Sequence, residues 1–151
     1  PQEAPRASPR RDPGAGVVFD LDAAGAFFAE LGMELENRMT IEGRWAERVV
    51  GLDDLRSEIA MMRVPGGPGR LELTRYHAPA PLDLGLGTAP PNVVALPRGM
   101  VAVDDLDDTV ERLARHGGAV LREIVRFEDA YRLCYLRGPG GIIVGLAEEL
   151  G

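Results

Sequence analysis

Few of the residue types that carry out chemistry occur in this chain of 151 residues. All 17 basic residues are arginine, which excludes lysine Schiff bases, lysine general bases and a lysine-containing phosphate loop. The two serines, Ser8 and Ser57, lie outside any G-x-S-x-G motif. His77, His116 and Cys134 are too few for a His/Cys zinc cluster. Much of ordinary enzyme chemistry is therefore excluded before any motif is considered.

The composition also restricts the partners and the compartment. The net charge of −7 argues against a nucleic acid or an anionic membrane as partner, because a negative field repels both. No stretch approaches the roughly 20 apolar residues needed to span a bilayer. A single cysteine cannot form an internal disulfide, so the cytosol is the natural compartment. We therefore expect a cytoplasmic protein with a small-molecule partner.

The elements that must position the remaining candidates are repeated along the chain. Residues 18–22 (VFDLD) recur as residues 103–107 (VDDLD), at an offset of 85. Both copies are followed by an amphipathic helical pattern of matched length. Gly32 and Gly117, also 85 apart, stand where a left-handed helix cap is expected. The sequence therefore predicts a duplicated module.

Strand-like stretches complete each copy. One apolar run precedes each predicted helix and three strand-like stretches follow it, which predicts an α+β fold of two βαβββ modules. The predicted strands after the helices cover residues 34–41, 55–64 and 70–76, then 119–126, 130–137 and 142–147. The predicted organisation is a disordered tail (1–12), a first module (13–76), a Pro/Gly-rich connector (77–97) and a second module (98–151).

The D-L-D helix entries, the strand at residues 69–73 (GRLEL) and the hairpin at residues 138–144 (GPGGIIV) resemble the vicinal-oxygen-chelate superfamily. This superfamily includes glyoxalase I, extradiol dioxygenases, methylmalonyl epimerase and bleomycin-resistance proteins. The resemblance covers residues 13–149. It implies that the two modules form a cupped, mixed-sheet pseudo-barrel around one small-molecule site. It also implies a homodimer.

Catalytic members of that superfamily bind a divalent metal through one residue on the first and last strand of each module. The resemblance places Pro13, Glu72, Arg98 and Gly145 at these positions. Only Glu72 is a usual ligand, because proline and glycine offer no donor atom and arginine is a permanent cation. We therefore expect neither a catalytic metal nor another cofactor.

The same resemblance directs Glu72 and Arg98 toward the centre of the cup. Arg98 would hold an anionic or carbonyl group of the ligand, and Glu72 would orient the ligand or act as a general base. The alternative is an ion pair that fills a degenerate metal site without chemistry. Met100, two residues after Arg98, is a further expected lining residue.

Strand alternation adds candidates on the strands in the middle of each module. If the helix packs on the more uniformly apolar strand face, Glu58 and Met62 point into the cup. Arg132 and Cys134 then do so from the equivalent strand, 74 residues later. Two simpler alternatives are that Glu58 and Arg132 are solvated at the rim and that Cys134 is an inert buried thiol.

The only tryptophan, Trp45, is expected on the loop between the second and third strands. There it would stack on a planar ligand or pin the loop to the sheet edge. His77 is expected at the start of the connector, exposed or supplying a ligand atom, and the helix dipole accounts for His116.

Three functions follow from these residues. The first is a metal-independent protein that binds a small planar or carbonyl-bearing molecule. The second is a metal-independent isomerase, cyclase or lyase with Glu72 as base and Arg98 stabilising an oxyanion. The third is a metal-dependent glyoxalase, epimerase or dioxygenase whose ligands include residues not placed above. The shortage of metal ligands favours the first two.

Overall fold

A computed structural model describes residues 14–151 and contains two modules of similar design. The predicted tail (1–12) and Pro13 lie outside the described residues. The first module holds strand β1 (Gly14–Val17), helix α1 (Leu21–Glu30) and strands β2 (Glu34–Glu42), β3 (Arg56–Arg63) and β4 (Arg70–Ala78). The second holds β5 (Arg98–Val103), α3 (Leu106–Ala114), β6 (Ala119–Val120), β7 (Val125–Phe127), β8 (Tyr131–Arg137) and β9 (Ile143–Glu149).

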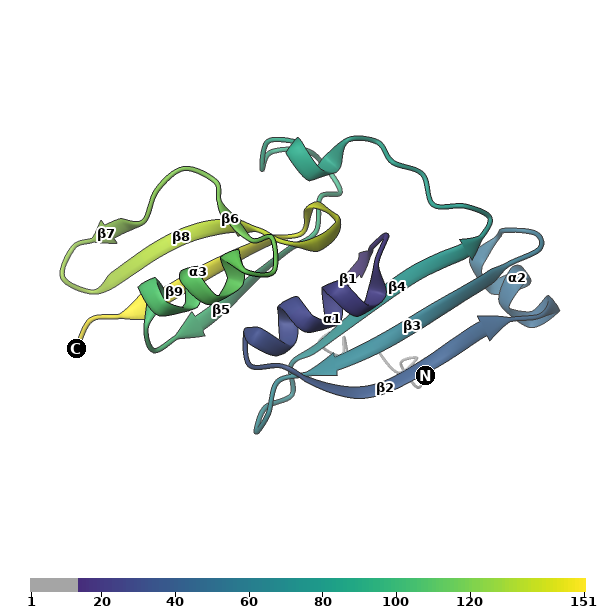
Figure 1. Cartoon of the computed structure of the whole chain (residues 1–151), viewed down its shortest axis with the longest axis horizontal. Coiled ribbons are helices and arrows are strands. Elements are labelled where there is room, and N and C mark those ends of the chain that lie inside the picture. The colour runs from purple at the N-terminus through teal and green to yellow at the C-terminus, as the bar shows by residue number, and fades with distance from the viewer. Residues whose placement is uncertain (1–13) are drawn as a thin grey trace, which may run out of the picture.

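Each module forms one mixed sheet. The strand order is β1-β4-β3-β2 in the first sheet and β5-β9-β8-β6 in the second, with β7 also paired to β8. The first strand of each module runs parallel to the last, and the other pairs are antiparallel. Figure 1 shows the two sheets side by side, with α1 and α3 on the same side of them. The α+β fold class is confirmed, and the two sheets do not close into a barrel.

The helices begin where the repeated D-L-D segments predict. The carboxylate of Asp20 accepts a hydrogen bond from the backbone N–H of Ala23, and Asp105 does the same for Asp108. These are N-cap interactions, which satisfy backbone donors that the first helical turn leaves unpaired. Gly32 and Gly117 follow the two helices with φ of 103° and 83°, as expected for left-handed caps.

Two elements differ from the sequence prediction. The loop between β2 and β3 contains a short helix, α2 (Arg44–Val50), and the strand predicted at residues 119–126 is divided into β6 and β7. The connector contains a 3-10 turn, η1 (Leu86–Thr88), and Arg137 donates hydrogen bonds to the backbone carbonyls of Leu86 and Ala89. No helix described here is long and apolar enough to cross a membrane.

The core lies between the helices and the sheets and continues across the junction of the two modules. Phe27 of α1 is fully buried, and its ring lies against Gly118 and Gly138 of the second module. A methyl group at either glycine would come within 3.0 Å and 3.1 Å of that ring, respectively, so both positions need glycine for this contact. The modules are therefore packed together through an aromatic side chain.

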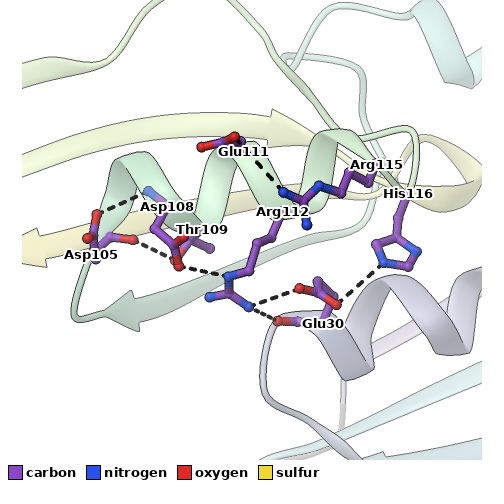
Figure 2. A network of polar contacts seen from close by, with 8 residues as sticks. All are labelled: Glu30, Asp105, Asp108, Thr109, Glu111, Arg112, Arg115 and His116. Atoms are coloured by element: carbon purple, nitrogen blue, oxygen red, sulfur yellow. Dashed lines mark hydrogen bonds and ion pairs between the residues drawn. The ribbon is translucent and has the colours of Figure 1, made fainter.

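A polar network joins the two helices beside this packed junction. Arg112 of α3 donates to the backbone carbonyl of Glu30 at 2.8 Å and to its carboxylate at 3.2 Å (Figure 2). His116 approaches the same carboxylate at 3.5 Å. The helix dipole had accounted for His116 in the sequence, whereas in the structure it also contacts the other module.

Candidate functional site

Each sheet has one face that lies away from α1 or α3, and we call these surfaces the open faces. Side chains alternate between the two faces of a strand, so every second residue lies on an open face. Glu72 in β4 and Arg98 in β5 are among them. Several large apolar side chains on the open faces are exposed, namely Val17, Met39, Met100, Val125, Phe127 and Tyr131. Exposed apolar residues gathered on one surface commonly mark a binding surface.

Glu72 lies in the middle of β4, on the open face of the first sheet. It stands between Ala15 of β1 and Met61 of β3, and its side chain is half-buried. Its carboxylate accepts one hydrogen bond, at 3.4 Å, from the hydroxyl of Thr74. Within residues 14–151 no guanidinium or imidazole forms an ion pair with it.

Arg98 begins β5 on the open face of the second sheet and is exposed. Its guanidinium donates to the backbone carbonyl of Pro91 at 2.6 Å and to the hydroxyl of Tyr135 at 3.3 Å. The guanidinium carbon also lies 5.1 Å from the centre of the Tyr135 ring, a cation–π contact. In the described part of the chain, Arg98 has no carboxylate partner, so the ion pair with Glu72, which was the alternative to ligand binding, is absent there.

The expected orientation of Glu58 and Met62 is wrong. Both lie on the face of β3 that α1 covers, and Met62 is 1% exposed. The Glu58 carboxylate contacts His77 at 2.7 Å and Arg38 at 3.1 Å. The hydrogen bond from His77, followed by that from Arg38, lowers the pKa of Glu58. Ile59 and Met61 take the open-face positions on this strand.

The expected orientation of Arg132 and Cys134 is also wrong, because both lie on the face of β8 that α3 covers. Arg132 forms two hydrogen bonds of 2.9 Å with Asp107 on α3, and contacts Glu148 at 3.3 Å. Hydrogen bonding to Arg132 lowers the pKa of Asp107. Cys134 is buried beneath α3, and its desolvation raises the pKa of the thiol, which disfavours the reactive thiolate.

These four corrections have one physical cause. Each helix covers the centre of its sheet with apolar contacts, while the strand ends extend beside the first helical turn. That turn carries acidic residues, Asp22 and Asp107, which pair with arginines on the strands below. The helix-covered face is therefore apolar at its centre and charged at its end. The more uniformly apolar strand face is for this reason not the face on which the helix packs.

Two other predicted residues remain on accessible surfaces. Trp45 lies on α2 rather than on a loop, and it is 60% exposed. Met100 lies on the open face beside Gly145, where a methyl group on the glycine would approach the Met100 sulfur to 2.8 Å. Met100 therefore fills the space that a side chain at position 145 would need.

The residues present do not fit the divalent metal that the superfamily resemblance implies. Pro13 lies outside the described residues, Gly145 has no donor, and the space beside it is occupied by Met100. Arg98 supplies a permanent positive charge, which would repel a divalent cation. Within residues 14–151 no group of three or more His, Cys, Asp or Glu side chains could hold a metal ion.

A cavity lies between the two modules, and two of the predicted lining residues, Arg98 and Met100, contribute to it, whereas Glu72 does not. Its volume is about 580 Å³, within the range of small-molecule sites. One wall is formed by β1, β4 and the end of α1, and the other by β5 and the start of β9. Its lining residues include Phe28, Met33, Val64, Arg70, Arg98 and Met100. No local pattern identifies it, because its lining comes from both halves of the chain.

A model of the Glyoxalase/Bleomycin resistance protein/Dioxygenase superfamily matches residues 15–146. Among solved structures, a glyoxalase family protein from Bacillus cereus is similar to this chain, with 45% sequence identity and a TM-score of 0.88. That match covers 98% of this chain and 100% of the other. No curated protein matched in the corresponding search.

More distant structures share the fold. TnmS3, an antibiotic binding protein from Streptomyces sp. CB03234, is 19% identical with a TM-score of 0.53, over 93% of this chain and 97% of that one. Glyoxalase I from Zea mays is 20% identical with a TM-score of 0.62, over 92% of this chain and 48% of that one.

Proposed function

Because this chain belongs to the Glyoxalase/Bleomycin resistance protein/Dioxygenase superfamily, we propose that it binds a small planar or carbonyl-bearing molecule without a catalytic metal. One observation carries the proposal: within the described residues, Arg98 is a guanidinium without a carboxylate partner, at the edge of an apolar cavity. Such a group is suited to hold an anionic or carbonyl oxygen. The antibiotic-binding neighbour of the same fold adds support.

The metal-independent part of the proposal rests on the donor set. Of the four positions that the superfamily resemblance assigns to metal ligands, only Glu72 carries a usual donor, because the others are Pro13, Arg98 and Gly145. Divalent ions bound by proteins need several converging nitrogen or oxygen donors. No step of ligand binding therefore requires a metal in this proposal.

Thermal shift with a metabolite library tests the proposal, because a ligand that binds the folded state raises the unfolding midpoint. For any ligand found, Arg98→Ala is expected to weaken binding about tenfold while leaving the midpoint of the free protein unchanged. EDTA treatment is expected to leave the affinity unchanged. A stoichiometric metal in the purified protein, or binding abolished by EDTA, would contradict the proposal.

A metal-independent isomerase, cyclase or lyase is a second candidate, favoured by the state of Glu72. In the described structure its half-buried carboxylate contacts only the Thr74 hydroxyl and has no ion-pair partner, so its oxygens are available to a substrate. Arg98 would then stabilise an oxyanion. Turnover of a bound ligand that Glu72→Gln abolishes, with affinity retained, distinguishes this candidate from a binding protein.

The protein is also proposed to be a cytoplasmic homodimer. The exposed apolar side chains on the open faces support a partner of the same kind, because burying them removes apolar area from water. The buried free thiol of Cys134 is consistent with a reducing compartment. The negative net charge supports a small-molecule partner over a nucleic acid.

A further inference from the structure

The cavity between the modules lies where two sheet edges meet. The strands β1 and β5 each end their sheet, and both contribute to the lining. Phe28 near the end of α1 lines the cavity, as do Leu31, the C-cap of that helix, and Met33. The cavity therefore has an apolar interior bounded by two edge strands.

The internal repeat relates this cavity to the contact that Phe27 makes in the second module. In the second module, the Phe27 ring is seated against Gly118 and Gly138. At the offsets of 85 and 74, the counterparts of those glycines are Met33 and Val64, and both line the cavity. The cavity thus lies in the first module at the place that corresponds to the Phe27 contact in the second, with the larger apolar side chains of Met33 and Val64 where the second module has two glycines.

At the position equivalent to Phe27, the second module has no aromatic side chain. The counterpart of Phe27, at the offset of 85, is Arg112. Its guanidinium extends to Glu30 and Asp108 instead, as Figure 2 shows. Both modules therefore have an apolar site at equivalent places, but an aromatic side chain at the Phe27 position fills only the one in the second module.

The charged groups around the cavity are of one sign. Arg70 and Arg98 line it, and none of its described lining residues is acidic. Arg70 is neutralised by Glu36, 2.6 Å away, whereas Arg98 bonds only to uncharged oxygens. One positive charge at the cavity therefore remains available to an anionic ligand.

From the apolar site and this unpaired charge, we infer that the cavity binds an aromatic molecule carrying one anionic group, such as a carboxylate or sulfonate. The aromatic part lies among Phe28, Met33 and Val64, and the anionic group on Arg98. This inference rests on the proposed small-molecule binding and specifies the ligand class. It assigns the ligand to the cavity between the modules.

Two fluorescent probes that share one aromatic body test the ligand class. The probe 8-anilinonaphthalene-1-sulfonate has the anionic group, and N-phenyl-1-naphthylamine lacks it. Titrations of the full chain are expected to give one saturable site, with the sulfonate binding about tenfold or more tightly. Equal affinities would overturn the anionic requirement and leave the proposed binding function in place.

Three variants test the position of the site. Arg98→Gln is expected to remove the preference for the sulfonate, because the unpaired charge is lost. Gly99→Leu is expected to weaken both probes at least tenfold, since Gly99 lines the cavity and has open space at its missing side chain. The matched control Gly25→Leu, on α1 and also facing open space, is expected to change neither affinity.

Binding that persists in Gly99→Leu would show that the probes occupy another surface and would overturn the assignment to this cavity. Absence of saturable binding by both probes in the unmodified protein would overturn the inference as well. The metabolite thermal-shift screen judges the proposed function separately, because it does not depend on either probe.

Discussion

Glu58 and Arg132 occupy equivalent strand positions with opposite charges, and both find their partners on the helix-covered side of the sheet. Arg132 pairs directly with Asp107 in the first turn of α3. Glu58 reaches the corresponding Asp22 through Arg38, which contacts both carboxylates. Each module therefore pairs the acidic residue at its helix start with an arginine on a strand, but the arginine comes from a different strand in each module.

The Asp107–Arg132 pair predicts a pH-dependent contribution to stability. Because Arg132 lowers the pKa of Asp107 in the folded state, the contribution is present above the usual aspartate pKa range and is lost as the pH falls through the lowered value. Asp107→Asn is therefore expected to lower the urea midpoint at pH 7 and to lower it much less at pH 2.

The control for this prediction is Asp53→Asn, which changes an exposed aspartate in the turn before β3. It is expected to shift the midpoint little at either pH, because exposed charges away from specific partners contribute little. A midpoint difference for Asp107→Asn that is the same at both pH values would contradict the proposed pairing.

At the level of elements, both helices and their caps were predictable because their signals are local. The repeated D-L-D segments place Asp20 and Asp105 at the helix starts, and glycine follows each helix end. The division into β6 and β7 and the short helix α2 were not predictable, because tertiary pairing decides where a short strand stops. The predicted side-chain directions in β3 and β8 were wrong, because they depend on which face of the sheet each helix covers.

The cap at Asp105 gives a prediction at this scale. Asp105→Ala removes the acceptor of the Asp108 N–H and is expected to destabilise the protein by about 1 kcal/mol, whereas Asp105→Asn retains most of the stability. The exposed neighbour Asp104 provides the matched control, Asp104→Ala. Chemical denaturation measures all three variants, and equal losses at positions 104 and 105 would contradict the cap assignment.

For the whole molecule, the open faces are the dominant feature, because they leave large apolar side chains in water on both sheets. The repeat predicted two modules, but the sequence could not show that the sheets lie side by side with a cavity between their edges. That arrangement depends on contacts between residues more than 80 positions apart, such as Arg112 with Glu30.

The proposed homodimer gives a prediction for the whole molecule. Sedimentation analysis at micromolar concentration is expected to give twice the chain mass of 16.3 kDa. Phe127→Glu places a charge on the open face and is expected to shift the protein toward monomer, because an unpaired buried charge is costly. Val94→Glu, at an exposed connector position, is expected to remain dimeric. A monomeric unmodified protein would contradict the dimer.

The contact of Phe27 with Gly118 and Gly138 also limits which halves of related proteins can be combined in one chain. The ring and its glycines stand on opposite halves, so a chimera that takes one half from a relative must inherit both partners or lose the junction. Recombination between halves is thereby constrained at three positions. Three residues that line the cavity are outside this constraint, and their substitution can change which ligands bind: Met33, Val64 and Arg98.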